Sequence, residues 1–155
     1  MKIFLKSIIS CFCILLFGCA TAGTSSLTVQ DPIGKNNLEP CPDTPNCVSS
    51  TEPTTNKRYI PPLGYSGGKA SAYRKLLSLI ESDPRAQIVD KRAGYLRAQF
   101  RSAIFGFVDD VEFHFSPEQS VIEVRSASRA GYYDFGKNRR RIEDIRKRWD
   151  KGAGY

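Results

Sequence analysis

The chain has 155 residues, 41% of them hydrophobic, and a formal net charge of +7 at pH 7. This length is typical of one domain rather than several, and the apolar content is sufficient for a hydrophobic core. The positive charge indicates anionic partners or anionic surfaces without specifying which, and a basic surface that is simply solvated would explain it equally well.

The first 18 residues are typical of an export signal. Lys2 and Lys6 form a short positive segment, and the apolar run from Ile8 to Phe17 is too short to span a bilayer. The quartet LFGC that ends at Cys19 resembles the lipobox of bacterial lipoproteins, which is cut before the cysteine that then receives lipid. Cleavage there would lower the net charge from +7 to +5, because Lys2 and Lys6 would leave. A buried apolar helix or an uncleaved anchor is the alternative.

Lipid on Cys19 would hold the chain on a bilayer, since each methylene of an acyl chain such as palmitate contributes about 0.8 kcal/mol. We therefore expect a lipoprotein of the cell envelope that faces the periplasm. Ala20 favours the outer over the inner membrane, because Asp commonly stands at that position in lipoproteins retained in the inner membrane. Residues 19–40 are rich in Thr, Ser, Gly, Asn and Pro and predict a flexible tether.

The segment CPDTPNCVSS, residues 41–50, contains two cysteines that would lie in an oxidising compartment. Five residues separate Cys41 from Cys47, and the prolines between them favour turns that let the two thiols meet. We expect a disulfide that closes a loop at the edge of the fold. A reduced pair, or a metal or redox role, is the alternative, but zinc would need more ligands than a chain with a single His offers.

The middle of the chain predicts a helix and then a hairpin. Residues 51–68 are rich in Pro and Gly and are expected to be irregular. A helix with one buried stripe should follow and end at Asp83-Pro84. Residues 86–91 and 95–101 predict two strands that turn at Ala93-Gly94. The residues of the helical stripe are Tyr73, Leu76, Leu77 and Ile80.

Two further strands are predicted around residues 108–115 and 121–128, where apolar and polar residues alternate. Their apolar faces coincide in an antiparallel register that pairs Phe115 with Ile122, whereas a slip by one residue would bury polar side chains. An apolar bend or bulge at residues 103–107 should connect this pair to the preceding hairpin. The same register sets polar residues in complementary pairs: Glu112 with Arg125, His114 with Glu123, and Asp109 with Ser128.

Asp109 departs from the alternation, because it is a carboxylate on the apolar face of its strand. A buried carboxylate needs partners, since leaving it unpaired costs several kcal/mol. Arg129 or Arg141 could provide them in a closed structural network, or these arginines could stay free for an anionic ligand, and both interpretations are open at this point. The candidate cluster, structural or ligand-binding, comprises Asp109, Asp110, Glu112, Arg125, Ser126, Ser128, Arg129, Asp134, Asn138 and Arg141.

The C-terminal part of the chain predicts a turn at residues 129–136, with Asp134 as the N-cap, and a helix over residues 136–151. Seven Lys and Arg residues against Glu143 and Asp144 make its outer face basic, and this face could meet anionic lipid, lipopolysaccharide or another envelope polymer. The inner stripe should hold Asn138, Ile142, Ile145 and Trp149, with Arg141 at its margin.

Together these elements predict an α+β domain over residues 41–151 in the order α-β-β-β-β-α. The expected architecture is a four-stranded antiparallel meander with the two helices packed on one face.

A hydrolase or a metal-assisted enzyme that uses the Asp109, Asp110 and Glu112 region is the alternative to a binding protein. Asp109 should face away from its neighbours. The three residues that share a face, Asp110, Glu112 and His114, span about 13 Å along the strand, which is too far to close on a single ion without other elements. A nucleophile at Ser126 or Ser128 would lack a base, because the single His is expected on the opposite face. We therefore assign no catalytic residue, metal or cofactor.

Three motifs in this order, CPDTPNCVSS, FVDDVEFHF and RSASRAGYYDFGKNRRR, resemble the bacterial family known as domain of unknown function 1499, many of whose members are small predicted lipoproteins. The resemblance extends from Cys41 to about Trp149. It implies no activity, because none is established for the family. The positions that it marks include both cysteines, Ser102 and every member of the candidate cluster except Arg141, while Tyr133 and Phe135 stand where Ser and Leu are expected.

The hypothesis that follows is a non-enzymatic binding module of the envelope. Its expected partners are the lipid bilayer, through Cys19, and an anionic envelope ligand or a protein. Nucleic acid is not an expected partner, because neither export nor any recognised motif supports it.

Overall fold

The sheet at the centre of the molecule has six strands, two more than predicted. In the computed structural model, which describes residues 38–152, the strand order is β1-β6-β5-β4-β3, and β2 also pairs with β6. The predicted export signal, Cys19 and nearly all of the predicted tether lie outside the described residues. The elements are β1 (Cys47–Ser49), β2 (Leu63–Gly64), α1 (Lys69–Glu81), β3 (Ala86–Arg92), β4 (Tyr95–Arg101), β5 (Val108–Phe115), β6 (Val121–Ser128) and α2 (Lys137–Lys151).

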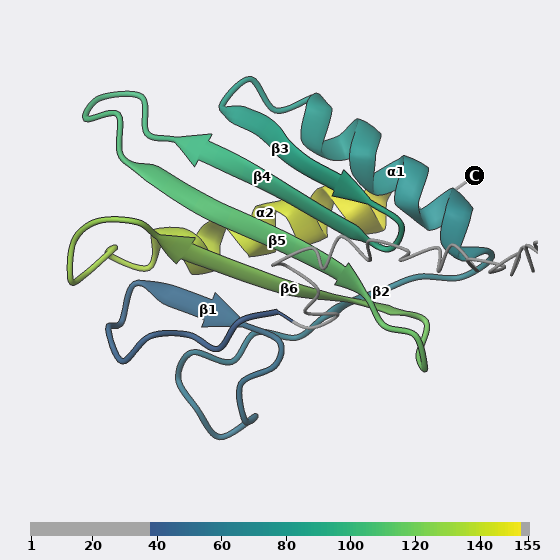
Figure 1. The fold of residues 1–155 in the computed structure, drawn as a ribbon, viewed down its shortest axis with the longest axis horizontal. Helices are drawn as coiled ribbons and strands as arrows, with labels where there is room; N and C mark the ends of the chain where they lie inside the picture. Colours follow the sequence, from purple (N-terminus) through teal and green to yellow (C-terminus); the bar gives the residue numbers. More distant parts are fainter. Residues whose placement is uncertain (1–37, 153–155) are drawn as a thin grey trace, which may run out of the picture. The chain divides into compact units, whose positions relative to one another are not determined.

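The α+β class and the antiparallel meander are confirmed, with β3 to β6 as its four strands. Figure 1 shows α1 and α2 behind the same face of the sheet. The two additional strands were missed because β1 and β2 have only three and two residues. Segments this short cannot display the alternation that identifies a strand in a sequence.

The register between β5 and β6 is the predicted one. Phe115 lies opposite Ile122 and Phe113 opposite Val124, and all four side chains are fully buried. The predicted polar pairs also form, with Glu112 opposite Arg125 and Asp109 opposite Ser128. Alternation with period two was sufficient here because only one register buries every aromatic ring of these strands.

Both helices bury one stripe against this sheet. Ala72, Leu76 and Ile80 are the buried residues of α1, while Tyr73 and Leu77 are only partly buried against the core. In α2 the buried residues are the four predicted ones, among them Asn138 and Trp149. No helix within residues 38–152 has the length and apolar character needed to cross a membrane.

The predicted disulfide joins Cys41 to Cys47. Cys47 is the first residue of β1 and lies opposite Ala127 of β6, and the two cysteines pack with Ala127 in a small cluster of their own. Ala127 alternates with Ser126, which faces the core, so this cluster lies on the sheet face that the helices leave uncovered. The disulfide therefore fixes β1 to the edge of the sheet as well as closing a loop.

Replacing both cysteines by Ser (C41S with C47S) should lower the free energy of unfolding by about 2 kcal/mol, the loop-closure contribution of such a short loop. Urea denaturation of the full chain would measure this loss. Reduction of the wild-type chain should give the same loss, and reduction should have no effect on the double variant. Equal stability of the oxidised wild type and the double variant would mean that the loop's hydrogen bonds alone hold β1.

Candidate functional site

Asp109 lies inside the fold with both carboxylate oxygens engaged. Its residue surface is 2% exposed. The Ser128 hydroxyl donates to Oδ1 at 2.6 Å, and the Arg141 guanidinium donates from Nη2 to Oδ2. Arg141 comes from α2 and Ser128 from β6, so the carboxylate joins three elements. The negative charge is thus paired and hydrogen-bonded, which is what its burial requires.

Arg141 is the second centre of this network. From Nη1 it donates to Oδ1 of Asn138 at 2.7 Å and to the hydroxyl of Ser126 at 3.1 Å. Its guanidinium carbon lies 5.0 Å from the centroid of the Phe100 ring, within the range of a cation–π contact. The side chain is only 10% exposed. Arg141 is therefore bound on several sides by the protein itself.

Asn138 and Asn46 complete the network. The amide of Asn138 donates to the Ser128 hydroxyl at 3.0 Å and to the backbone oxygen of Asn46 at 2.8 Å. The Ser126 hydroxyl donates to Oδ1 of Asn138 at 2.6 Å. Sequence reasoning missed Asn46, which is buried and donates to the backbone oxygen of Gly131. The only sign in the sequence that Asn46 is buried was its position next to Cys47 of the predicted disulfide.

No buried side-chain nitrogen or oxygen of this network lacks a hydrogen-bond partner within residues 38–152. A ligand would have to break existing bonds in order to reach Asp109 or Arg141. Of the two interpretations that the sequence left open, the geometry favours the closed structural network. We call the set of Asn46, Asp109, Ser126, Ser128, Asn138 and Arg141 the buried network.

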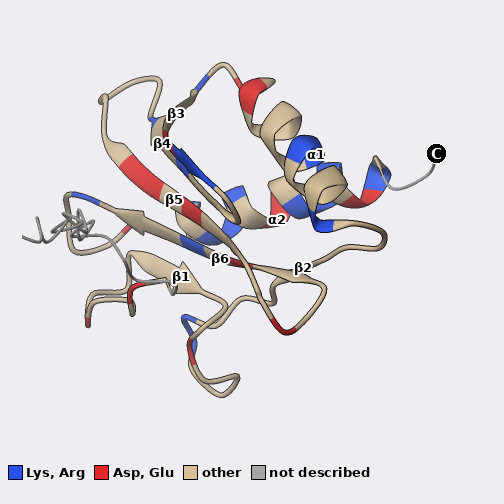
Figure 2. Cartoon of the chain, turned by 45° about the vertical axis from the view of Figure 1, so that its right-hand side comes forward, with Lys and Arg blue, Asp and Glu red and all other residues tan. Residues whose placement is uncertain are grey.

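The other acidic residues of β5 lie on the uncovered face of the sheet. Asp110 accepts two hydrogen bonds from Arg129, at 2.6 and 2.9 Å, and Glu112 accepts one from Arg125 at 2.7 Å. Tyr95 on β4 donates to Glu112 at 2.7 Å. In Figure 2 the red segments of β5 lie between blue segments of β4 and β6. Nine of the ten candidate residues therefore form two groups, one on each face of the sheet, and the tenth, Asp134, lies in the turn before α2.

Two pKa values on this uncovered face follow from these contacts. Burial, followed by the hydrogen bond to Glu112, raises the pKa of the Tyr95 hydroxyl far above its ordinary value. The hydrogen bond to Asp110 and the charge of Asp110 raise the pKa of Arg129. Tyr95 and Arg129 therefore keep their protons, and can donate, to a higher pH than the same groups free in water.

The N-cap of α2 differs from the prediction. The N-cap residue is Gly136, and Asp134 lies two residues before it. The Asp134 carboxylate accepts from the backbone N–H groups of Gly136 at 2.9 Å and Asn138 at 2.8 Å, so it still satisfies the first turn of the helix. Phe135 and Gly136 both have positive φ, 55° and 71°, and this left-handed turn separates Asp134 from the helix start.

The outer face of α2 supplies less free positive charge than the sequence indicated. Arg139 donates to two backbone carbonyls of residues 57–59, at 2.7 and 2.8 Å. Arg146 donates to the backbone oxygen of Pro62 at 2.8 Å, and Arg148 donates to that of Leu79 at 2.6 Å. These three arginines bind α2 to neighbouring segments. They are therefore not available to an external ligand without loss of those contacts.

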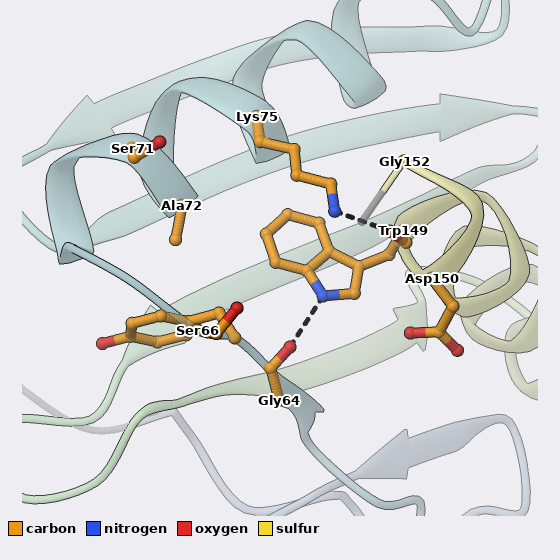
Figure 3. Close-up of a pocket in the computed structure, with 9 residues that line it drawn as sticks. Gly64, Ser66, Ser71, Ala72, Lys75, Trp149, Asp150 and Gly152 are labelled. Atoms are coloured by element: carbon orange, nitrogen blue, oxygen red, sulfur yellow. Dashed lines mark hydrogen bonds between the residues drawn. The ribbon is translucent and has the colours of Figure 1, made fainter. Parts of the chain in front are cut away.

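One surface hollow, of about 430 Å³, lies beside Trp149 (Figure 3). The indole nitrogen donates to the backbone oxygen of Gly64 at 2.8 Å, which ties α2 to β2. Lys75 donates to the backbone oxygen of Trp149 at 2.7 Å and lies 4.2 Å from the centroid of its ring. Lys75, the cation that lines this hollow, is therefore already bound by Trp149.

A second hollow, of about 730 Å³, lies between the start of α1 and the β3–β4 turn. Four cationic side chains line it and no carboxylate does. Arg74 and Lys91 are exposed, and neither has an ion pair within the described residues. We call this the cationic hollow, lined by Lys69, Ala70, Tyr73, Arg74, Lys91, Arg92, Ala93 and Gly94.

Among residues 38–152, no group of three or more His, Cys, Asp or Glu side chains is placed so that it could hold a metal ion. His114 is engaged by Glu123, with Nδ1 and Oε2 2.9 Å apart.

The fold and this site define a class of protein: a disulfide-containing α+β domain with a buried ion-pair network and charged surface regions. The chain belongs to the family described as Protein of unknown function (DUF1499), whose sequence profile matches residues 37–148. No curated protein and no solved structure matches the chain significantly.

The buried network predicts unequal effects for two arginine substitutions. Arg141→Met should destabilise the protein by about 3 to 5 kcal/mol, because it leaves the Asp109 carboxylate buried without its cation. Arg129→Met removes the partner of Asp110 on the surface and should cost far less. Chemical denaturation of the two variants would compare them, and equal losses would contradict a structural role for the network.

Asp83, just after α1, predicts a dependence of stability on pH. Burial alone would raise the pKa of Asp83, but hydrogen bonds from Arg85 and the charges of Arg85 and Arg148 together lower it below its ordinary value of 3.8. A lowered folded-state pKa stabilises the protein above pH 3.8, and this contribution is lost as the pH falls through the lowered value.

Asp83→Asn should therefore be less stable than wild type near neutral pH, and the difference should shrink as the solution is acidified below the ordinary pKa. Denaturation curves at several pH values would measure it. A difference that stays constant down to the acid limit would show that the charge of Asp83 has no part in stability.

Proposed function

We propose that the protein is a lipoprotein of the bacterial cell envelope whose domain binds an anionic ligand and does not catalyse a reaction. The export-signal pattern supports anchoring through lipid on Cys19, with the domain on the periplasmic side and the outer membrane favoured over the inner. The observation that carries the binding proposal is the cationic hollow, which gathers four positive side chains without a carboxylate.

The cationic hollow suits a ligand with a phosphate or carboxylate group. Lys69 donates to the backbone oxygen of Phe115 at 3.2 Å, and Arg92 forms an ion pair with Asp90 at 3.0 Å, so these two cations are held in place. Arg74 and Lys91 are exposed and available, and a guanidinium can bind two oxygens of one phosphate. Tyr73 adds an apolar wall for the uncharged part of a ligand.

The alternative, a hydrolase or metal-assisted enzyme, has less support. Asp109 lies on the core face of β5, whereas Asp110 and Glu112 lie on the uncovered face. Each of the three carboxylates is already engaged by an arginine, at positions 141, 129 and 125. These carboxylates are therefore better explained by structural pairing than by catalysis.

Long-chain inorganic polyphosphate, a model polyanion, can test the proposal by titration calorimetry with the full chain. The double variant R74E with K91E should bind it at least roughly tenfold more weakly, because it removes two charge-assisted contacts and introduces repulsion. The affinity of the wild type should also fall as salt is added.

The matched control is K57E with K147E, which changes the net charge by the same amount at two exposed positions away from the hollow. It should lose only the small share of affinity that depends on overall charge. Equal weakening in both double variants would mean that binding follows net charge, and the cationic hollow would no longer be supported as the site.

A further inference from the structure

Two loops at one end of the sheet carry almost all of the exposed large hydrophobic side chains. One loop, residues 102–107, connects β4 to β5, and the other, residues 129–136, connects β6 to α2; Figure 1 shows both at the same end of the sheet. In the described part of the chain, six of the seven such side chains lie here, and the seventh is Val89. The six are Ile104, Phe105, Phe107, Tyr132, Tyr133 and Phe135. We call this region the aromatic end.

These side chains protrude from loops that have defined backbone structure. Ile104 is 84% exposed, Phe105 74% and Phe135 77%. Two hydrogen bonds close the first loop. The Ser102 N–H donates to the backbone oxygen of Phe107 at 2.9 Å, and the Phe107 N–H donates to the Ser102 hydroxyl at 3.0 Å. The rings of Phe105 and Phe107 contact each other, with centroids 5.8 Å apart. Folding of the domain therefore leaves these rings in water without burying them.

The backbone conformation at Phe135 is a second notable feature of the aromatic end. Its φ of 55° lies in the left-handed region, which is unfavourable for a residue with a Cβ. The ring contacts Tyr133 edge-on, with centroids 5.0 Å apart, and remains largely exposed. Hydrogen bonds of the turn hold this conformation, from the Gly136 N–H to Asp134 at 2.9 Å and from Arg140 to the Phe135 backbone oxygen at 2.8 Å, and it keeps the ring outside the core.

Positive charge surrounds the aromatic end. Arg101 and Arg140 are exposed and Lys137 is half-buried, and none of them has an ion pair within residues 38–152. Arg140 donates from Nη1 to the backbone oxygen of Phe135 at 2.8 Å, which places its charge beside that ring. Asp110 and Asp134, the carboxylates near these loops, are occupied by Arg129 and by the start of α2. Aromatic and aliphatic side chains with a basic rim are the chemistry of a protein surface that enters the headgroup region of an anionic bilayer.

We propose that the aromatic end docks on a bilayer containing anionic phospholipid. Ile104, Phe105 and Phe135 would enter the boundary between headgroups and acyl chains, while the basic rim meets the phosphates. A second copy of the chain is a poorer occupant, because two basic rims would repel each other. The cationic hollow lies at the opposite end of β3 and β4 and would then face away from the bilayer. This docking depends neither on the proposed ligand nor on lipid at Cys19.

The test adds one tryptophan to the full chain and mixes each variant with vesicles of phosphatidylethanolamine and phosphatidylglycerol whose acyl chains carry bromine. Bromine quenches the fluorescence of a tryptophan that enters the bilayer, and this quenching is measured. Phe105→Trp and Phe135→Trp report on the two loops, and Gln119→Trp, in the exposed β5–β6 turn at the other end of the sheet, is the control. Trp149 is buried and forms the same background in all variants. Quenching at positions 105 and 135 should exceed that at 119 by roughly threefold or more.

Two further arms separate the possible occupants. Reversing the rim charges (R101E, K137E and R140E) should abolish most of the quenching at position 105, as should vesicles of phosphatidylcholine alone. Equal quenching at 105 and 119, or none at 105 and 135, would overturn the proposal. It would also be overturned if the emission of Trp at 105 shifted to the blue with rising protein concentration and no vesicles, since the occupant would then be a second copy.

Discussion

The buried ion pair between Asp109 and Arg141 is the constraint on which the rest of the structure depends. It couples β5 to α2 in the core, and its remaining hydrogen bonds run through Ser128 and Asn138 to the segment around Asn46. A buried charge pair adds little net stability over an apolar core, but either partner is very costly to bury alone. The network therefore penalises every arrangement of β1, β5, β6 and α2 other than the observed one.

The same need for partners explains where much of the positive charge lies. The Pro-rich segment before α1 forms only the short β2 and an isolated bridge, so many of its backbone carbonyls have no strand partner. Arg139 and Arg146 donate to carbonyls of this segment from α2. Buried or half-buried backbone oxygens require donors, and long arginine side chains supply them where a sheet cannot. Much of the basic character of α2 is therefore structural.

Within the described residues, the exposed groups that make no such structural contact lie mainly at the two ends of the sheet. At one end, exposed rings such as Phe105 and Phe135 stand beside a basic rim, and at the other end Arg74 and Lys91 line the cationic hollow. The uncovered face between them is filled by charge pairs such as Glu112 with Arg125. Pairing within this face leaves few unmatched charges, so the exposed groups of the described domain that lack a partner gather mainly at the two ends of the sheet.

The sequence by itself determined the features that depend on local periodicity: the register of Phe113 with Val124, the buried stripe of α2 that includes Trp149, and the short loop that Cys41 and Cys47 close. The partners of the buried network that come from outside β5 and β6 were decided only by the tertiary structure. Arg141 rather than Arg129 pairs with Asp109, and Asn46 joins the network from more than 60 residues away in the chain. Side-chain spacing fixes which face a residue occupies, because backbone geometry is local. Which distant group meets it depends on how the packed layers bring separate segments together.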